Sequence, residues 1–194
     1  MPDQFTAPCW ADCDSAELVN AAARFFSTRA EMLDGHLIVS PPQDFAHSTA
    51  VLEVAFQLKA AAVPHVDLGS GYATTPGTGP RTLVLPDVAV MSRKPTASDI
   101  AHRTPDAVWY STGILAMAVE VTSDNHEIDT GPKHRAYAAA GVPVYVIVHR
   151  QRGRVFVHTD RAGSRYLTTA SRKLGDKLPL PAPYPPLDTS ALLG

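Results

Sequence analysis

The chain has 194 residues, of which 45% are hydrophobic and 19% are charged, a balance that is typical of one globular domain and excludes a disordered chain. No apolar run approaches the roughly 18 residues that a membrane-spanning helix needs, and the N-terminus lacks the features of a signal peptide. The two cysteines, Cys9 and Cys13, are too few for a disulfide framework, so we expect a cytoplasmic protein without a membrane partner.

The net charge of −2 hides an asymmetry along the chain. Residues 1–132 carry 7 basic and 16 acidic residues, a balance of −9, whereas residues 133–177 carry 10 basic and 2 acidic residues, a balance of +8. This division is compatible with acidic groups that hold a cation and a basic region that faces a polyanion. It is also compatible with C-terminal strands that have solvated basic outer faces, and charge alone favours this simpler interpretation.

Hydrophobic periodicity and turn residues predict alternating helices and strands. In chain order the expected elements are a helix over 14–33, a strand over 36–40, a helix over 45–62, strands over 65–68 and 82–92, a loop or short helix over 94–106, a strand over 114–122, a helix over 133–140, a strand over 142–148 and a hairpin over 154–170. This order indicates an α/β protein with a mixed central sheet flanked by helices. Residues 1–178 are expected to form one domain, followed by a Pro-rich tail over 179–194, of which residues 179–186 are expected to extend over the surface.

Two carboxylates lie where a folded protein rarely places them. Asp87 follows Pro86 inside an apolar run, and Glu120 lies near the end of the most apolar strand. A buried carboxylate is costly unless it is paired, hydrogen-bonded or bound to a metal, and two neighbouring carboxylates repel unless a cation lies between them. Oxygen ligands of this kind suit Mg²⁺ or Mn²⁺. For either residue alone an outward-facing or Arg-paired carboxylate is the simpler interpretation, but the two together favour a metal site.

A lysine downstream has a spacing that allows it to reach the same place. Asp129 and Lys133 are spaced i, i+4, and Tyr137 follows four residues later. Because Pro132 predicts that Lys133 lies in the first turn of its helix, the ammonium is expected to point back towards the strand that carries Glu120 and to stabilise negative charge there. The alternative is an ordinary helical Asp–Lys pair. Tyr137 is expected to be a packing residue with a solvated hydroxyl and not a catalyst.

These residues occur in order with other short motifs. The motifs are Asp34–Pro42, His47, Pro86-Asp87, Val119–Ser123, Asp129-x3-Lys133-x3-Tyr137 and Gly141–Val148. Over residues 31–158 the set resembles the Uma-two family of restriction endonucleases, within the PD-(D/E)XK nuclease superfamily. The resemblance implies a restriction-endonuclease-like α/β fold and metal-dependent hydrolysis of phosphodiester bonds in nucleic acid.

The resemblance also implies roles for individual residues. Asp87 and Glu120 would be metal ligands, the Val121 carbonyl a further ligand, and Glu31, from the first helical region, would complete the metal shell. The superfamily lysine usually lies two residues after the Glu; here Lys133, from the following helix, would supply it. His47 matches a family position, and we assign it no chemistry.

Two hypotheses about function follow. The first is an endonuclease that uses Mg²⁺ or Mn²⁺ to cut DNA, with Asp87, Glu120 and Lys133 as catalytic residues. Its backbone-phosphate contacts would come from Arg150, Arg152 and Arg154. Because one active site cuts one strand, a homodimer is compatible with this reading, although the sequence carries no interface signature.

The second hypothesis is a catalytically silent nuclease-fold module for binding or assembly. It is motivated by Thr122, which occupies the position of the superfamily lysine, and by the acidic balance of the chain. A general α/β domain whose carboxylates are structural is a third and weaker alternative.

Overall fold

The computed structural model describes residues 14–74 and 82–192. The helical elements are α1 (Ser15–Phe26), α2 (Phe45–Ala60), η1 (Ala97–Asp99), η2 (Thr112–Ile114), α3 (His126–Ile128), the π-helical turn η3 (Asp129–Lys133), α4 (His134–Ala139) and η4 (Ser190–Leu192). The strands are β1 (Ala30–Leu33), β2 (His36–Val39), β3 (Val66–Asp67), β4 (Gly71–Ala73), β5 (Leu83–Val84), β6 (Val88–Met91), β7 (Ile100–Arg103), β8 (Val108–Ser111), β9 (Leu115–Val121), β10 (Val144–His149), β11 (Arg154–Ala162), β12 (Arg165–Lys173), β13 (Lys177–Leu178) and β14 (Leu187–Asp188). None of the described helices is long and apolar enough to cross a membrane.

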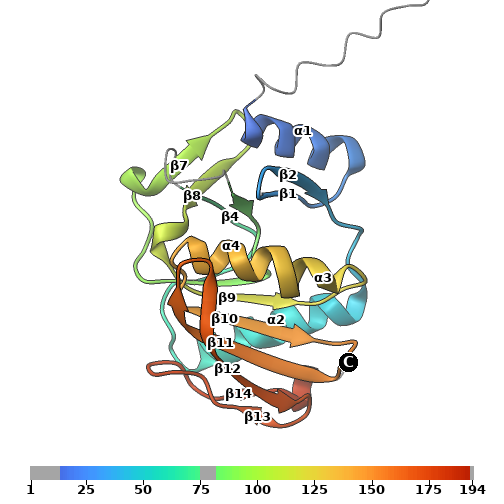
Figure 1. Cartoon of the computed structure of the whole chain (residues 1–194), viewed down its shortest axis with the longest axis vertical. Helices are drawn as coiled ribbons and strands as arrows, with labels where there is room; N and C mark the ends of the chain where they lie inside the picture. Colours follow the sequence, from blue (N-terminus) through green and yellow to red (C-terminus); the bar gives the residue numbers. More distant parts are fainter. Residues whose placement is uncertain (1–13, 75–81, 193–194) are drawn as a thin grey trace, which may run out of the picture.

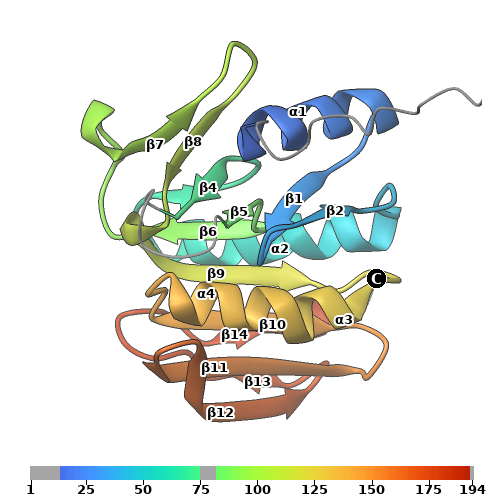
Figure 2. The same ribbon diagram turned by 45° about the horizontal axis from the view of Figure 1, so that its top comes forward.

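A six-stranded sheet with the order β12-β11-β10-β9-β6-β3 lies at the centre of the molecule. β9 and β10 are parallel and are joined by the segment α3–η3–α4, whereas the other neighbouring strands are antiparallel. Valines of β6, β9, β10 and β11 pack against α2 on one face, and α4 covers the other face (Figures 1 and 2). The predicted α/β class, with a mixed central sheet flanked by helices, is confirmed.

A second six-stranded sheet, with the order β2-β1-β5-β4-β8-β7, lies beside the first and carries α1. The sequence patterns did not predict this sheet as a separate layer. Its residues Leu33, Tyr72 and Val84 share a hydrophobic cluster with α4 and with β9 and β10. The two sheets therefore face each other across the helical segment that joins β9 to β10, and a site between them can take side chains from both.

The first helix ends earlier than predicted. α1 stops at Phe26, Ser27 has a left-handed backbone with φ of 51°, and strand β1 follows where the pattern predicted helix to residue 33. The Ala, Glu, Met and Leu of β1 favour a helix, but all four are buried and pair with β2. Tertiary pairing therefore outweighs local propensity here, and Glu31 lies on a strand and not on the predicted helix.

The apolar run at 82–92 forms two strands that belong to different sheets. β5 pairs with β1 and β4, whereas β6 pairs with β9 and β3. Pro86 lies between them and cannot donate a ladder hydrogen bond, which favours the interruption. Asp87 is consequently held on the link between the two sheets. Strand β7 lies within the stretch predicted as a loop or short helix over 94–106. It has only four residues, none of them fully buried, and polar residues surround it in the sequence, which explains why the pattern missed it.

The helix that carries Lys133 begins at His126, so the prediction that it starts near Pro132 is wrong. Pro132 lies inside the π-helical turn η3, between α3 and α4. A proline inside a helix removes one i→i−4 hydrogen bond, and a single π-type turn lets the helix continue past it. Lys133 is therefore in the middle of a helical segment.

The Pro-rich C-terminal segment packs on the core. β14 pairs with β13, Gln57 of α2 hydrogen-bonds to the backbone of Asp188, and Leu187 and Leu192 join the cluster around α2. Within residues 179–186, the part expected to extend over the surface, Leu180 and Tyr184 are partly buried against the same cluster. The division into a domain over 1–178 and a tail over 179–194 stays a prediction.

We expect Leu187→Ala to lower the free energy of unfolding by about 2–5 kcal/mol, because it removes a core side chain that is only 2% exposed. Urea unfolding followed by circular dichroism would measure the change. Leu167→Ala is the matched control, since Leu167 is 70% exposed and its loss should change stability by less than about 0.5 kcal/mol. Equal effects of the two substitutions would contradict the packing of the C-terminal segment.

Candidate active site

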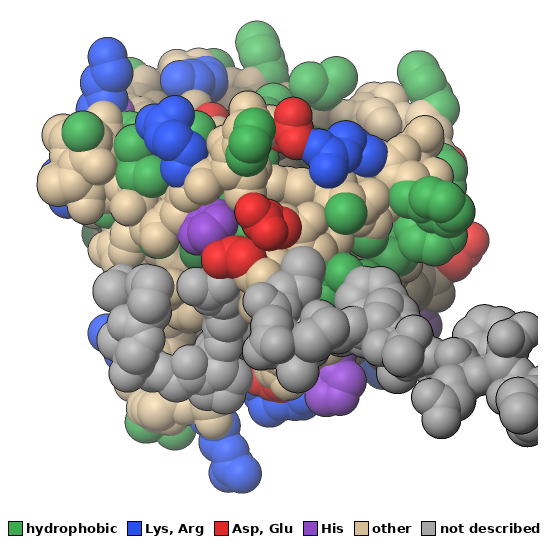
Figure 3. Space-filling model, turned by 90° about the horizontal axis from the view of Figure 1, so that it is seen from above, with side chains coloured by type: hydrophobic (Ala, Val, Ile, Leu, Met, Phe, Trp, Pro, Cys, Tyr) green, Lys and Arg blue, Asp and Glu red, His purple; other side chains and the backbone are tan. Residues whose placement is uncertain are grey.

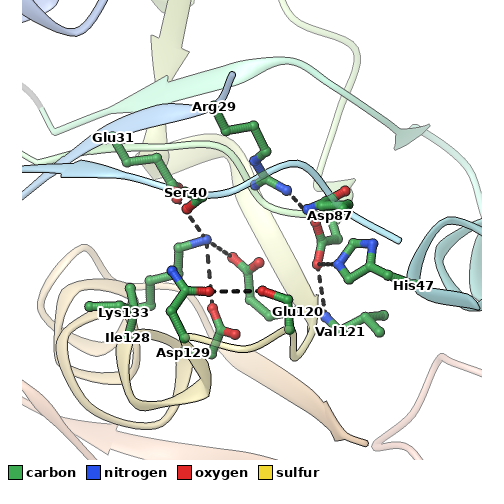
Figure 4. Close-up of a pocket in the computed structure, with 13 residues that line it drawn as sticks. Arg29, Glu31, Ser40, His47, Asp87, Glu120, Val121, Ile128, Asp129 and Lys133 are labelled. Carbon is green, nitrogen blue, oxygen red and sulfur yellow. Dashed lines mark hydrogen bonds and ion pairs between the residues drawn. The ribbon is translucent and has the colours of Figure 1, made fainter. Parts of the chain in front are cut away.

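Charged side chains from both large sheets and from the α3–η3–α4 segment converge on one small pocket (Figure 4). Its charged residues are Arg29, Glu31, Asp87, Glu120, Asp129 and Lys133. The cavity volume is about 20 Å³, which is room for one water-sized group. A histidine of α2, His47, also lines the pocket.

Asp87 is held by donors from three directions. Its Oδ2 accepts the backbone N–H of Val121 at 2.8 Å and lies 3.2 Å from Nε2 of His47. Its Oδ1 accepts a hydrogen bond from Nη1 of Arg29, and Nε2 of Gln43 lies 3.4 Å away. These donors bring α2, the start of β1 and the end of β9 to a single carboxylate.

Glu120 projects from β9 towards the α4 face of the central sheet. The strand alternation places it on the opposite face from the valines that pack on α2. Its Oε1 accepts a hydrogen bond from the hydroxyl of Tyr137 at 2.7 Å and lies 3.0 Å from Nζ of Lys133. Tyr137 packs in the core as expected, but the expectation of a solvated hydroxyl is wrong, because the hydroxyl is buried and donates to Glu120.

Lys133 is enclosed by three carboxylates. Its Nζ lies 3.0 Å from Oε2 of Glu31, 3.0 Å from Oε1 of Glu120 and 3.8 Å from Oδ1 of Asp129. The other oxygen of Glu31 accepts the backbone N–H of Leu85 at 2.6 Å. The ammonium is thus a buried bridge between β1 of one sheet and β9 of the other.

The environment shifts the carboxylates in opposite directions. Burial raises the pKa of Glu120 well above its ordinary value, and the positive charge of Lys133 only partly offsets this. Burial alone would also raise the pKa of Asp87, but the hydrogen bond from His47 and the charge of Arg29 lower it below its ordinary value. Burial likewise opposes the charge of Lys133, yet Glu120 and Glu31 raise its pKa, so the ammonium stays protonated. Pairs of carboxylates whose environments separate them in this way are typical of sites that carry out acid–base or metal chemistry.

The structure brings Asp87, Glu120, Glu31, Val121 and Lys133 together in the pocket. It does not place the three predicted nucleic-acid contacts there. Both Nη atoms of Arg150 bind the carboxylate of Asp44, the N-cap of α2. Arg152 and Arg154 are exposed at the turn between β10 and β11.

Sequence reasoning missed two partners of Asp87, namely Arg29 and His47. They lie 58 and 40 residues from Asp87 in the chain, and no local spacing connects them. The signal that could have pointed to them is the presence of a buried anion without a neighbouring cation in the sequence, since such a charge needs a partner from elsewhere in the fold.

Burial raises the pKa of Asp129 to about 6, so the folded chain binds a proton there more tightly than the unfolded chain does. Ionised Asp129 then lowers stability above about pH 6, and this cost disappears as the pH falls towards the ordinary carboxylate pKa of about 4. We expect Asp129→Asn to raise the free energy of unfolding by about 1 kcal/mol near pH 7.5 and to give no gain near pH 4.

Urea unfolding in a chelator at the two pH values would test this expectation. Asp124→Asn is the control, because Asp124 is exposed and outside the pocket. Loss of stability in Asp129→Asn near pH 7.5 would mean that the attraction to Lys133 outweighs the cost of burial.

Comparisons with known proteins agree with this architecture. No curated protein matches the chain. The fold is similar to the crystal structure of "a putative nuclease belonging to DUF820" from Anabaena variabilis, with a TM-score of 0.59 and 16% sequence identity over 86% of this chain and 90% of that chain. A model of the Uma2 family, described as "Putative restriction endonuclease", matches residues 23–191. The family resemblance predicted from the motifs is confirmed, and the chain belongs to the Uma2 family.

Proposed function

We propose that this chain is a metal-dependent endonuclease that hydrolyses phosphodiester bonds in nucleic acid, with DNA as its substrate. The family and the fold support a nuclease at a coarse level. Because a fold does not establish an activity, the finer proposal depends on the site. The observation that carries it is the convergence of Asp87, Glu120 and Lys133 on one buried pocket.

The pocket has donor chemistry that fits Mg²⁺ or Mn²⁺. Four carboxylates and two permanent cations line it, so the fully ionised set has a net charge of −2 that a divalent ion would balance. Lys133 and Tyr137 both bind Oε1 of Glu120, and among the described residues Oε2 has no hydrogen-bond partner, so it is available to an ion.

Within residues 14–74 and 82–192, no three His, Cys, Asp or Glu side chains are arranged to hold an ion by themselves. This arrangement suits Mg²⁺, because Mg²⁺ in proteins is commonly bound by one or two carboxylates and completes its shell with water and substrate phosphate oxygens. A site with few protein ligands is therefore consistent with an ion that binds together with its substrate.

In this proposal Asp87, Glu120 and the carbonyl of Val121 hold the ion, which when bound lowers the pKa of a water and polarises the phosphate. Lys133 fixes the position of Glu120 and supplies positive charge beside the reacting phosphate. Glu31 stays a predicted ligand. Its Oε2 lies 3.0 Å from Nζ of Lys133, so we also assign to Glu31 the positioning of that ammonium.

The nucleic acid would be bound through exposed arginines. Figure 3 shows that, outside the grey atoms, Lys and Arg form separate groups on the face seen from above, with acidic side chains between them. Arg152 and Arg154 are exposed, and Nη2 of Arg154 donates to the hydroxyl of Ser171 at 2.6 Å. Arg150 would first have to release Asp44. Contacts of this kind give salt-dependent binding with little sequence preference.

A silent binding module is the second candidate function, and one observation favours it. Arg29 and Lys133 already pair with Asp87 and Glu120, so the carboxylates are stabilised by the protein alone. In that case the pocket would be a structural ion-pair network, and a protein partner would bind elsewhere on the chain.

We expect the purified chain to cut supercoiled plasmid or single-stranded DNA in Mg²⁺ or Mn²⁺, and Glu120→Ala to reduce the rate by at least about a hundredfold. Gel electrophoresis of the products would measure the rate. A single active site cuts one strand, so a lone copy should produce nicked circles before linear DNA, whereas a homodimer that acts on both strands should produce linear DNA directly.

Glu127→Ala is the matched control for this assay, because Glu127 is exposed and does not line the pocket. Cleavage that persists in Glu120→Ala would exclude this pocket as the active site. If no variant cuts any nucleic acid, the silent module is favoured, and a partner retained equally by wild type and by the Asp87→Ala/Glu120→Ala variant would support it.

Ion binding can be measured without turnover. We expect Mg²⁺ or Mn²⁺ at about a hundred times its Kd to stabilise the wild-type fold by about 2.7 kcal/mol. The Asp87→Ala/Glu120→Ala variant should show no such gain, since it lacks both proposed ligands. Thermal unfolding with increasing metal concentration would detect the difference, and an equal gain in both proteins would place the ion elsewhere.

A further inference from the structure

Arg29 has one guanidinium arm in use and one that lacks a partner. Its Nη1 donates to Oδ1 of Asp87, whereas its Nη2 is buried and has no hydrogen-bond partner among the described residues. Of the described residues that line the carboxylate pocket, only Arg29 and His47 have such a buried, unpartnered side-chain nitrogen. Figure 4 shows the Arg29 guanidinium beside Asp87 at the edge of the pocket.

An unpaired donor of this kind is unusual. Buried polar groups in folded proteins nearly always have a partner, and a buried donor without one is costly, more so on a charged group. Burial opposes the charge of Arg29, but Asp87, Glu31 and Glu120 raise its pKa further above its ordinary value, so the group stays cationic. The second arm is therefore a fixed positive donor that lacks an acceptor.

A second hollow adjoins the carboxylate pocket at Arg29. It has a volume of about 440 Å³ and includes residues from the end of α1 and from the loop that follows β2. Arg29 and Gln43 line both hollows. The second hollow is a shallow depression open to solvent, with a volume in the range of sites that take small organic ligands, whereas the carboxylate pocket itself has room for only one water-sized group. Arg29 thus stands at the boundary between the proposed catalytic groups and a space wide enough for a nucleotide.

Of the two permanent cations in the pocket, Arg29 is the one with a donor to spare. Lys133 has Glu31 and Glu120 at 3.0 Å and Asp129 at 3.8 Å from its Nζ, and its nitrogen is not among the buried atoms of the described residues that lack a partner. Arginine also suits a phosphate better than lysine does, because its planar fork can direct two N–H groups at once.

We propose that Arg29 binds the phosphodiester of the nucleic-acid strand through its Nη2 arm, and that the adjoining hollow takes the nucleotide next to that phosphate. This inference rests on the proposed nuclease function, and it adds the residue that positions the substrate. Arg29 would connect the two parts of the site, since one arm orients Asp87 and the other holds the strand.

Arg29→Lys is the decisive variant, because lysine keeps the charge beside Asp87 but lacks the second arm. Binding is measured by fluorescence anisotropy with a labelled single-stranded DNA oligonucleotide and its RNA equivalent in Mg²⁺. All proteins carry Glu120→Gln so that no strand is cut. We expect Arg29→Lys to raise the Kd by about tenfold or more. Arg24→Ala, which removes an exposed arginine paired with Asp106, should change the Kd by less than about twofold.

A second variant adds charge at the same boundary without touching the arginine. Gln43 is exposed, and its contact with Asp87 is long, at 3.4 Å. Gln43→Lys should therefore fold normally and bind the oligonucleotide several-fold more tightly, whereas Ser98→Lys, at an exposed position outside both hollows, should not. This pair keeps the test valid even if Arg29→Lys unfolds.

The outcomes separate this inference from the proposed function. If the Glu120→Gln protein binds and Arg29→Lys binds equally well with an unchanged melting temperature, the role of Arg29 is overturned while the nuclease proposal stands. If Gln43→Lys binds the oligonucleotide no more tightly than Ser98→Lys does, the proposed position of the nucleic-acid strand is likewise overturned. If the Glu120→Gln protein binds neither DNA nor RNA, the proposed function fails and this inference fails with it.

Discussion

The buried ammonium of Lys133 is the interaction on which the rest of the site depends. Three carboxylates from different elements lie within 4 Å of its Nζ, and without a cation between them they would repel one another in a low-dielectric interior. The positions of β1, of β9 and of the helical segment over 126–139 are therefore coupled through one charge. Each element alone would have a buried ion that it could not satisfy.

The arrangement in two sheets brings these carboxylates together. Glu31 belongs to one sheet and Glu120 to the other, and Asp87 lies on the link where Pro86 interrupts the strand run. A single continuous strand over 82–92 would have placed Asp87 within one ladder, with its carboxylate on one face only. The interruption lets Asp87 accept donors from α2, from β9 and from the residue before β1. The catalytic geometry that we propose is thus a consequence of how the two sheets are joined.

Local pattern predicted those parts of the site whose partners are close in sequence or set by strand alternation. Glu120 stands out because an acidic residue interrupts an apolar strand, and Lys133 because it is spaced i, i+4 from Asp129. Both lie in the pocket. The predicted start of this helix was wrong because Pro132 is a strong local signal for a first helical turn. In the structure Pro132 lies inside the helical segment, in the π-helical turn η3. The sequence pattern placed Glu31 in a helix because the residues around it favour helix formation. They form strand β1 because they pair with β2.

Residues that depend on distant contacts could not be found in this way. The roles of Arg29 and His47 at Asp87 arise from the packing of α2 and β1 around the link between the sheets.

Thr122 shows that a residue's position in a sequence motif does not by itself reveal which groups surround it in the fold. It lies two residues after Glu120, where the motif resemblance predicts a lysine. In the structure its hydroxyl donates to Oε1 of Gln151 at 2.6 Å and accepts the backbone N–H of Arg150 at 3.0 Å. The residue therefore ties the end of β9 to the turn after β10, while the positive charge at Glu120 comes from a helix. Because the fold brings Lys133 to Glu120 from another element, a threonine at position 122 leaves Glu120 with a positively charged partner.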